Sequence, residues 1–277
     1  MKSILPLLLT LVMTISWGQD PIIKAPKTTW QMFTYDAGTM FTSIGYAYTR
    51  PLYWKGPQWQ TMGAVAGGTG FLYLFDDQTS KFFRDGRDHV PSFIRHYGEF
   101  IGNPENNYSV TAGVYFTGLF TKNEKLRRTG VLLISSASAT GLLQQIMKSL
   151  AGRARPISGQ SKDTFDPFNA SRNYHSFPSG HAMMAFTNAY VIGKQFKNPW
   201  VKAGIYTVGL VPGISRVWDG QHWLSDVAFS VAMSVFTVEA IDRYLDSKYA
   251  EKYNDQNKLV SWNLTFAPGQ IGVIARF

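Results

Sequence analysis

The sequence contains no cysteine. Disulfide scaffolds, thiol nucleophiles and cysteine-ligated zinc sites are therefore excluded. Charged residues make up only 16% of the chain, and no long run of basic residues of the kind found in nucleic-acid-binding arms occurs. We expect no nucleic acid partner. The mean hydropathy of -0.12 is too polar for a chain made mostly of strongly apolar spanning helices, although it leaves room for weaker spans.

The abundant residue types indicate a folded chain. Apolar residues make up 45% of the 277 residues and aromatic residues 15%, which excludes a disordered or low-complexity protein. This length suits one large domain or two small ones. The net charge of +9 is spread along the chain, and such a charge suits anionic membrane surfaces or phosphorylated substrates without choosing between them.

The first residues have the pattern of a targeting segment. Lys2 supplies a positive start, an apolar stretch runs from Ile4 to Ile15, and Ser16 and Gly18 are small residues at the positions that a signal peptidase requires. We therefore predict a cleaved signal peptide over residues 1–18, and hence export to the periplasm or the envelope membrane. The alternative is a first transmembrane helix, for which the apolar stretch is short.

The mature chain has three parts by pattern. Residues 19–57 are rich in Pro, Thr, Tyr and Trp and are expected to form an irregular N-terminal arm or short helices. Residues 58–247 hold six apolar segments of helical length, which predict an all-α bundle of about six core helices. The segments cover residues 58–75, 108–121, 129–147, 181–193, 201–214 and 223–241.

The last residues change from a helical pattern to an alternating one. Val260, Trp262, Leu264 and Phe266 alternate with polar residues, a Pro-Gly turn follows, and the alternation resumes to the end. This pattern predicts a β-hairpin within residues 248–277. Because two strands cannot close a barrel in lipid, we expect the hairpin to pack on the helical core.

Two apolar segments raise the question of membrane embedding. Gly56 to Phe75 and Thr129 to Met147 contain no charged residue and are long enough to span a bilayer. Both are also rich in Gly, Thr, Ser or Gln, and the segments at 181–193 and 201–214 are short for spans. The pattern leaves open a soluble or surface-associated helical domain and a multi-span protein.

A first cluster of functional residues follows the third apolar segment. Lys148 and Arg155 are seven residues apart, which would place both cations on one face of a helix that Pro156 then stops. Two such cations suit an oxyanion with several oxygens, and Arg offers a bidentate fork. The alternative is a solvated basic helix end.

A second cluster precedes the fourth apolar segment. In Phe177-Pro178-Ser179-Gly180-His181, Ser179 can cap the helix that starts there, and the first helical amides can face an anion. Gly180 allows a ligand to approach the backbone closely. His181 would lie in the first turn beside the ligand. The alternative is an ordinary capped helix with an exposed histidine.

A third cluster lies before the last apolar segment. Arg216 adds another cation, and His222 and Asp226 are four residues apart, as on one helical face. A carboxylate beside an imidazole fixes its tautomer and keeps one ring nitrogen available. The alternative is a surface ion pair of small energy.

Two weaker candidates remain. Asp76 and Asp77 look like paired carboxylates after an apolar helix, but a helix-end or capping role fits them better. His175 could line a pocket from the long polar region 157–177, although a simple polar loop residue is the more ordinary interpretation.

Taken together and in this order, the three clusters resemble the type 2 phosphatidic acid phosphatase superfamily, which also contains bacterial acid phosphatases and vanadium-dependent haloperoxidases. The resemblance covers about residues 129–241. It implies that His222 is the nucleophile, that Asp226 orients it and that His181 is the general acid. It also implies a set of phosphate-binding residues, which are Lys148, Arg155, Ser179, Gly180 and Arg216.

The resemblance implies a phosphomonoesterase that works through a phosphohistidine. Three cations and a helix N-terminus supply positive charge for phosphoryl transfer, and no motif of His and carboxylates with metal-ligand spacing occurs, so we expect no metal and no cofactor. The substrate would be a lipid phosphate or a soluble phosphate ester. Two alternatives remain, a vanadate-dependent haloperoxidase and a non-catalytic phosphate- or lipid-binding module.

Overall fold

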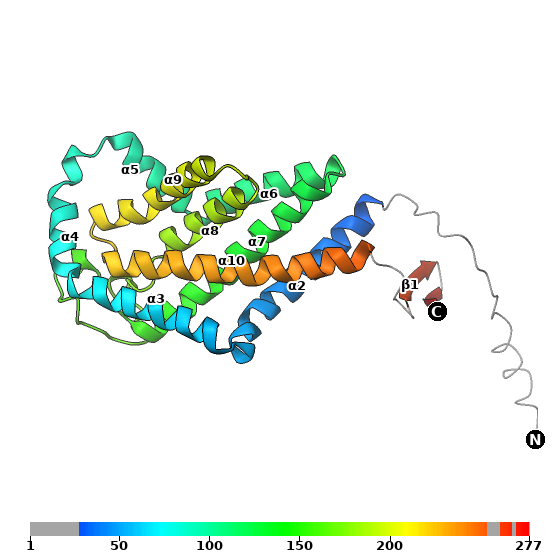
Figure 1. Cartoon of the computed structure of the whole chain (residues 1–277), viewed down its shortest axis with the longest axis horizontal. Helices are drawn as coiled ribbons and strands as arrows, with labels where there is room; N and C mark the ends of the chain where they lie inside the picture. The colour runs from blue at the N-terminus through cyan, green and yellow to red at the C-terminus, as the bar shows by residue number, and fades with distance from the viewer. Residues whose placement is uncertain (1–27, 254–260, 268–269, 277) are drawn as a thin grey trace, which may run out of the picture.

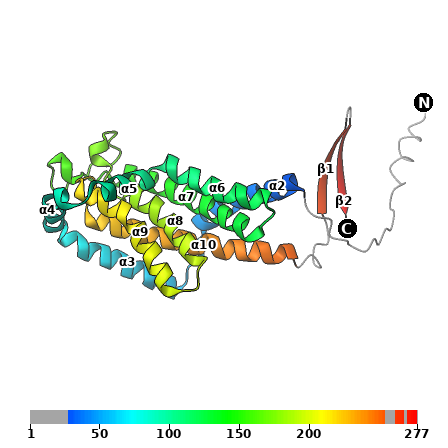
Figure 2. The same ribbon diagram turned by 90° about the horizontal axis from the view of Figure 1, so that it is seen from above.

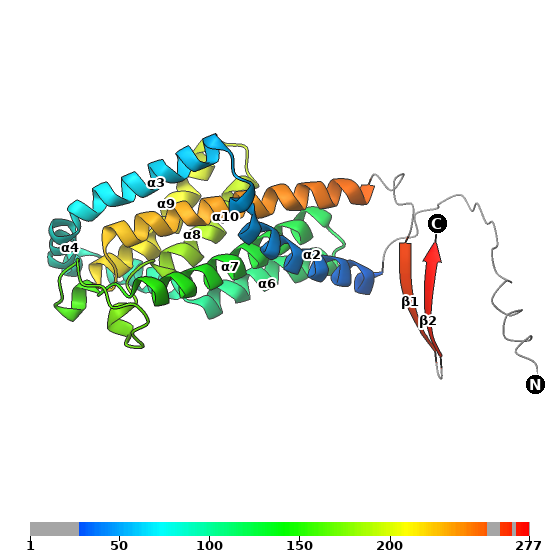
Figure 3. The same ribbon diagram turned by 90° about the horizontal axis from the view of Figure 1, so that it is seen from below.

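The computed structural model describes residues 28–253, 261–267 and 270–276. The described chain is mostly helical, which confirms the predicted class. Long helices lie side by side along one axis, as Figure 1 shows and the turned views of Figures 2 and 3 repeat. The predicted signal peptide lies outside the described residues, so it stays a prediction.

The helices are α2 (Thr29–Thr49), α3 (Gly56–Leu74), α4 (Asp76–Asp85), α5 (Ser92–Gly102), α6 (Pro104–Phe120), α7 (Glu124–Ala151), α8 (Gly180–Lys194), α9 (Pro199–Trp218) and α10 (Leu224–Tyr253). Short 3₁₀ helices follow at η1 (Arg50–Tyr53), η2 (Arg87–His89), η3 (Pro156–Ser158) and η4 (Arg172–Tyr174). The six predicted apolar segments overlap α3, α6, α7, α8, α9 and α10. Strands β1 (Ser261–Ala267) and β2 (Gln270–Arg276) pair antiparallel with each other.

Local signals explain where the bundle helices begin. Asn103, Asn123 and Asn198 each precede a helix and accept a hydrogen bond from one of its first amides, at the starts of α6, α7 and α9. Such side chains satisfy amides that have no partner inside the helix. Proline occupies the first helical position of α6 and of α9, where its missing N–H costs nothing.

Residues 29–49 form one long helix, α2, where the sequence predicted an irregular arm or short helices. Thr28 caps this helix in a capping box with Gln31. Its buried side chains are Met32, Asp36, Thr39 and Ser43. Their spacing of three and four residues places them on one helical face. That face packs against α7 and α10. Small and polar residues supply most of the buried stripe, so an apolar periodicity could not reveal it.

A buried ion pair holds α2 in the bundle. The Oδ2 atom of Asp36 lies 2.5 Å from Nε of Arg127 on α7. The hydroxyls of Tyr115 and Tyr249 donate to the same carboxylate from α6 and α10. Four helices therefore meet at one carboxylate, which explains why the segment before the predicted bundle belongs to the core.

Helix α8 lies at the centre of the bundle, because it packs against α7, α9 and α10. Nearly all of its side chains from Ala182 to Ala189 are buried. In contrast, α3 is apolar and has no buried residue at all. Among the described residues, α7 and α10 are long and apolar enough to cross a membrane. The bundle thus combines a tightly packed centre with an apolar outer surface.

Candidate active site

The three sequence clusters meet at one end of the bundle. The loop after α7, the start of α8 and the turn between α9 and α10 lie together with α4 at the left of Figure 1, and the turned views agree. The site is therefore built from segments that are far apart in the sequence.

Gly180 allows α8 to start directly beside Lys148. A Cβ atom at Gly180 would lie 3.3 Å from Nζ of Lys148 and 2.5 Å from Oε1 of Gln144. An added Cβ would have to displace the ends of these two side chains, so the backbone at the N-terminus of α8 comes close to the ammonium group. Ser179 caps α8, as predicted, and its own N–H donates to the hydroxyl of Ser230 at 2.8 Å.

Lys148 and Arg155 do not lie on one helical face, contrary to the prediction. Helix α7 ends at Ala151, because Gly152 adopts a left-handed conformation with φ of 58°. A Cβ atom there would collide with the backbone of Asp166, so a side chain would be excluded as well as strained. The loop after Gly152 brings Arg155 to the site.

Arg155 is held by the surrounding loops. Its N–H donates to the carbonyl of Asn173 at 2.8 Å, and its guanidinium donates to Oε1 of Gln221. Burial lowers the pKa of Arg155, and the nearby cations Arg216 and Arg172 lower it further. Three cations, Arg155, Arg172 and Arg216, thus lie near one another in this part of the site. Arg172 is a cation that the sequence clusters did not include.

His222 is fixed by a backbone carbonyl. Its Nδ1 lies 2.5 Å from the carbonyl oxygen of Ser176. A carbonyl can only accept, so Nδ1 carries the proton and Nε2 keeps a free lone pair. The side chain is buried, and burial lowers the pKa of His222 to about 4. The ring is therefore neutral at neutral pH, in the form that can attack an electrophile.

Asp226 lies beside His222 but in a different way from the prediction. His222 precedes α10, so the two residues do not share a helical face, and Oδ2 of Asp226 is 3.8 Å from Nδ1. The carboxylate accepts three hydrogen bonds, from the hydroxyl of Ser176 at 2.5 Å, the N–H of Trp223 at 2.9 Å and Nη1 of Arg153 at 2.6 Å. It therefore orients the loop that carries the imidazole.

His181 lies in the first turn of α8, as predicted. Burial lowers the pKa of His181 to about 3, and the charges of Arg216, His222, Lys148 and Arg155 act in the same direction. These four groups therefore surround His181. Gly102 on α5 completes the packing, because a Cβ atom at Gly102 would collide with the imidazole of His181.

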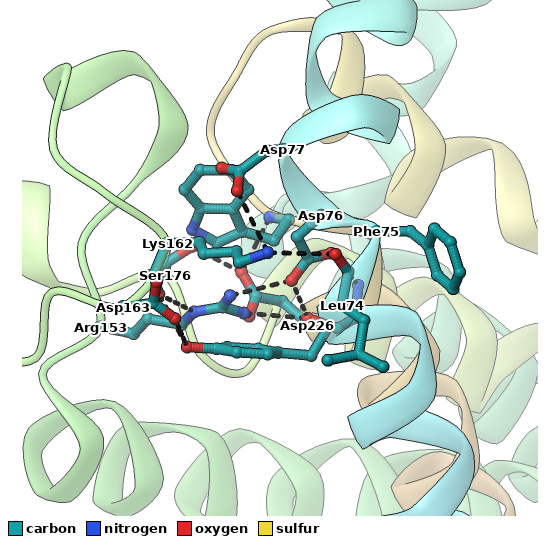
Figure 4. A network of polar contacts seen from close by, with 12 residues as sticks. Leu74, Phe75, Asp76, Asp77, Arg153, Lys162, Asp163, Ser176 and Asp226 are labelled. Atoms are coloured by element: carbon teal, nitrogen blue, oxygen red, sulfur yellow. Dashed lines mark hydrogen bonds and ion pairs between the residues drawn. The ribbon is translucent and has the colours of Figure 1, made fainter.

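Several residues of the site were missed by the sequence clusters. Ser176, Arg153 and Asp76 form a buried polar network with Asp226, which Figure 4 shows from close by. Arg153 lies inside the first cluster, two residues before Arg155, and this position could have identified it as a residue of the site. His175 remains a loop residue, since its Nε2 is 2.9 Å from the carbonyl of Asn169.

A cavity of about 500 Å³ opens next to Arg216. Arg84 and Arg87 line it from α4 and η2, and Trp218 at the end of α9 and Gln221 in the α9–α10 turn line it as well. Because Gln221 also accepts from Arg155, the cavity borders the cation cluster. Within the described part of the chain, no group of three or more His, Cys, Asp or Glu side chains could hold a metal ion.

Comparison with known proteins finds a family match and several relatives. The model of the PAP2 superfamily matches residues 129–247. A lipid A 1-phosphatase of Rhizobium etli is 26% identical over 66% of this chain and 81% of its own length. A lipid A 1-phosphatase of Porphyromonas gingivalis is 36% identical over 40% of this chain and 23% of its own length.

A crystal structure of Aquifex aeolicus LpxE aligns with a TM-score of 0.45 and 20% identity, over 59% of this chain and 94% of that chain. The family match spans the three clusters, from the end of α7 to the start of α10. Residues 129–247, which carry all three clusters, therefore match the PAP2 superfamily, and the matches support a phosphatase of this superfamily.

Proposed function

We propose that the enzyme removes phosphate from a phosphorylated lipid without a metal, through a phosphohistidine on His222. The observation that carries this proposal is the hydrogen bond from Nδ1 of His222 to the carbonyl of Ser176. It leaves the Nε2 lone pair available in a buried site that also contains Lys148 and Arg155. A nucleophilic imidazole requires this tautomer, and phosphoryl transfer requires the positive charge.

The phosphate is held by residues from all three clusters. Lys148, Arg155 and Arg216 bind its equatorial oxygens, and the amides at the start of α8, after Ser179 and at Gly180, complete the cradle. Their charge and the helix N-terminus stabilise the negative charge of the transition state. The close approach of Gly180 to Lys148 supports a common binding point for these groups.

The reaction has two steps with one nucleophile each. In the first, Nε2 of His222 attacks phosphorus, the ester P–O bond breaks, and the leaving alkoxide takes a proton from His181. In the second, His181 takes a proton from water, the oxygen attacks phosphorus, and the P–N bond breaks to release phosphate. The same imidazole thus serves as acid and then as base.

The low pKa of His181 has a direct consequence for this cycle. In the free site the ring is neutral, because it is buried and surrounded by cations. A bound phosphate dianion counters those cations, so the pKa of His181 rises when substrate binds. The proton that the leaving group needs is therefore held at His181 only in the presence of substrate.

A lipid phosphate is the substrate class that the surface favours. Exposed apolar side chains continue to the site end of the bundle, and they include Leu150, Ile157, Phe165 and Phe168. Two helices are long and apolar enough to cross a membrane, and the relatives named above are lipid A 1-phosphatases. Together these features support action at a membrane surface, and the signal peptide predicted over residues 1–18 is the reason that we propose the exported side of the bacterial envelope.

The test is phosphate release by the purified chain in detergent with EDTA present. We expect release from a phosphorylated lipid in mixed micelles, and a loss of about 10⁴-fold or more in His222→Ala. Equal release from a soluble aryl phosphate would show that the enzyme does not recognise the lipid chain of its substrate. Absence of release from both esters would overturn the proposal, and vanadate-dependent oxidation of bromide would replace it by a haloperoxidase.

A further inference from the structure

Arg153 holds two buried carboxylates together at the back of the site. Its Nη1 lies 2.6 Å from Oδ1 of Asp226, and its Nη2 lies 2.8 Å from Oδ2 of Asp76. The three side chains are at most 1% exposed. Figure 4 shows the guanidinium between the two carboxylates. One carboxylate belongs to the first turn of α10 and the other to α4, outside the region that the superfamily model matches.

Arg153 has no group left for the substrate. Its Nε donates to the carbonyl of Lys162 at 3.2 Å, and Nη1 also donates to the hydroxyl of Ser225 at 2.9 Å. The rings of Tyr73 and Trp223 lie 4.6 and 5.3 Å from the centre of the guanidinium. Each nitrogen has a protein partner, so Arg153 differs from the phosphate-binding cations and acts through Asp226.

Asp76 holds the first turn of α10. Its Oδ1 accepts from the N–H of Ser225 at 3.0 Å, and its Oδ2 accepts from the hydroxyl of the same residue. Ser225 is the second residue of α10, where backbone amides have no partner inside the helix and a negative charge is favourable. A carboxylate from α4 therefore caps α10, which begins two residues after His222.

We propose that Arg153 and Asp76 are positioning residues of the catalytic site, which hold Asp226 and the first turn of α10 so that Nε2 of His222 faces the phosphate. Arg153 occupies Oδ1 of Asp226, and this leaves Oδ2 for Ser176 and for the edge of the imidazole. Ser176 in turn supplies the carbonyl that fixes the His222 tautomer. The inference rests on the proposed function, because it assigns a role within that reaction.

The charges around His222 determine what the loss of Arg153 does. Lys148 and Arg155 face the ring from α7 and the loop after it, His181 lies near it on α8, and Asp226 faces it from α10. Removal of the guanidinium leaves the negative charge of Asp226 less neutralised at this ring. The His222 imidazolium is then stabilised, so its pKa rises by about one unit.

The experiment combines kinetics with histidine NMR on the full chain in detergent. In Arg153→Lys and Arg153→Gln we expect kcat to fall about 100-fold, since small misplacements of reacting groups have effects of this size. KM should stay within about threefold, because the phosphate-binding cations are untouched. The His222 resonances should titrate about one pH unit higher in Arg153→Gln than in wild type.

Asp76→Asn tests the second carboxylate, and Asp77→Asn is its matched control. Asp77 is the next residue, is 57% exposed and pairs with Lys162, so the same change there should leave kcat unchanged. If Asp76 acts through Arg153, the losses of kcat in Asp76→Asn and Arg153→Gln will not add in the double variant. Arg153→Gln leaves the carboxylates of Asp76 and Asp226 without their cation. The double variant removes the first of these two charges.

The outcomes separate this inference from the proposed function. Absence of turnover by wild type would overturn the proposed function, while the His222 titration would still report on Arg153. An unchanged His222 titration in a folded Arg153→Gln protein, or a loss of activity that follows only the loss of folded protein, would overturn the positioning role. Wild-type kcat in Arg153→Gln would overturn it as well.

Discussion

The replacement of Asp226 by Asn changes one buried oxygen to an amide and should cost both stability and rate. In wild type, Oδ1 accepts from Arg153, and Oδ2 accepts from Ser176 and from the N–H of Trp223. An asparagine amide must point toward donors whichever way it is flipped. Toward Arg153 it meets a guanidinium, and toward Trp223 it leaves a buried N–H without an acceptor.

The size of the effect follows from these contacts. The loss of a charge-assisted hydrogen bond costs about 1.5–3 kcal/mol, and a buried donor without a partner costs about 1–3 kcal/mol. We therefore expect the free energy of unfolding to fall by about 3–5 kcal/mol. The rate should fall by only about 10²–10³-fold, because the Ser176 carbonyl still fixes the tautomer of His222.

The assay is phosphate release at saturating substrate, together with thermal unfolding of the same preparation. We expect Asp226→Asn to retain more activity than His222→Ala, which lacks the nucleophile. A variant that unfolds within about 1 °C of wild type and retains half of its rate would refute the reasoning, since it would show that the three hydrogen bonds to Asp226 hold nothing in place.

Two further predictions concern the histidines. Gly102→Ala places a methyl group against the His181 imidazole and should lower kcat about 10-fold or more. Its control is Gly113→Ala on α6, which has open space around the new Cβ and should leave kcat unchanged. Equal rates in the two variants would contradict the packing of α5 on His181. Burial lowers the pKa of His222 to about 4, so the free enzyme should keep this ring neutral from neutral pH down to about pH 5 and protonate it near pH 4. NMR of the labelled histidines measures this directly, and a His222 titration near the ordinary value of about 6.5 would show that the ring is solvated.

Sequence patterns predicted α3 and α6 to α10 because each contains an apolar segment of helical length, whereas α4 and α5 contain none of the predicted segments. The same criterion missed α2, whose buried face carries Asp36, Thr39 and Ser43 and depends on a partner, Arg127, far along the chain. No local pattern reports such a pairing. The apolar outer surface of α3 shows the reverse case, since an apolar sequence there does not mean burial in the bundle.

The residue types of the site were readable from the sequence, but their geometry was not. The order of the three clusters identified Lys148, His181 and His222 as candidates. The end of α7 at Gly152 depends on a contact with Asp166, which spacing alone cannot show. Likewise, the partner of Nδ1 in His222 is a backbone carbonyl. Every residue type has a backbone carbonyl, so the sequence cannot show which one binds the imidazole.

The most direct test of the account is to identify the atom that carries the phosphoryl group during turnover. His181→Asn should slow the second step, while 4-nitrophenyl phosphate has a leaving group that needs little help from an acid. We therefore expect this variant to accumulate a covalent phosphoenzyme after mixing and an alkaline quench. Mass spectrometry should place the phosphoryl group on Nε2 of His222. A phosphoryl group on another residue, or turnover by this variant with no phosphoenzyme in the quenched protein, would contradict the account.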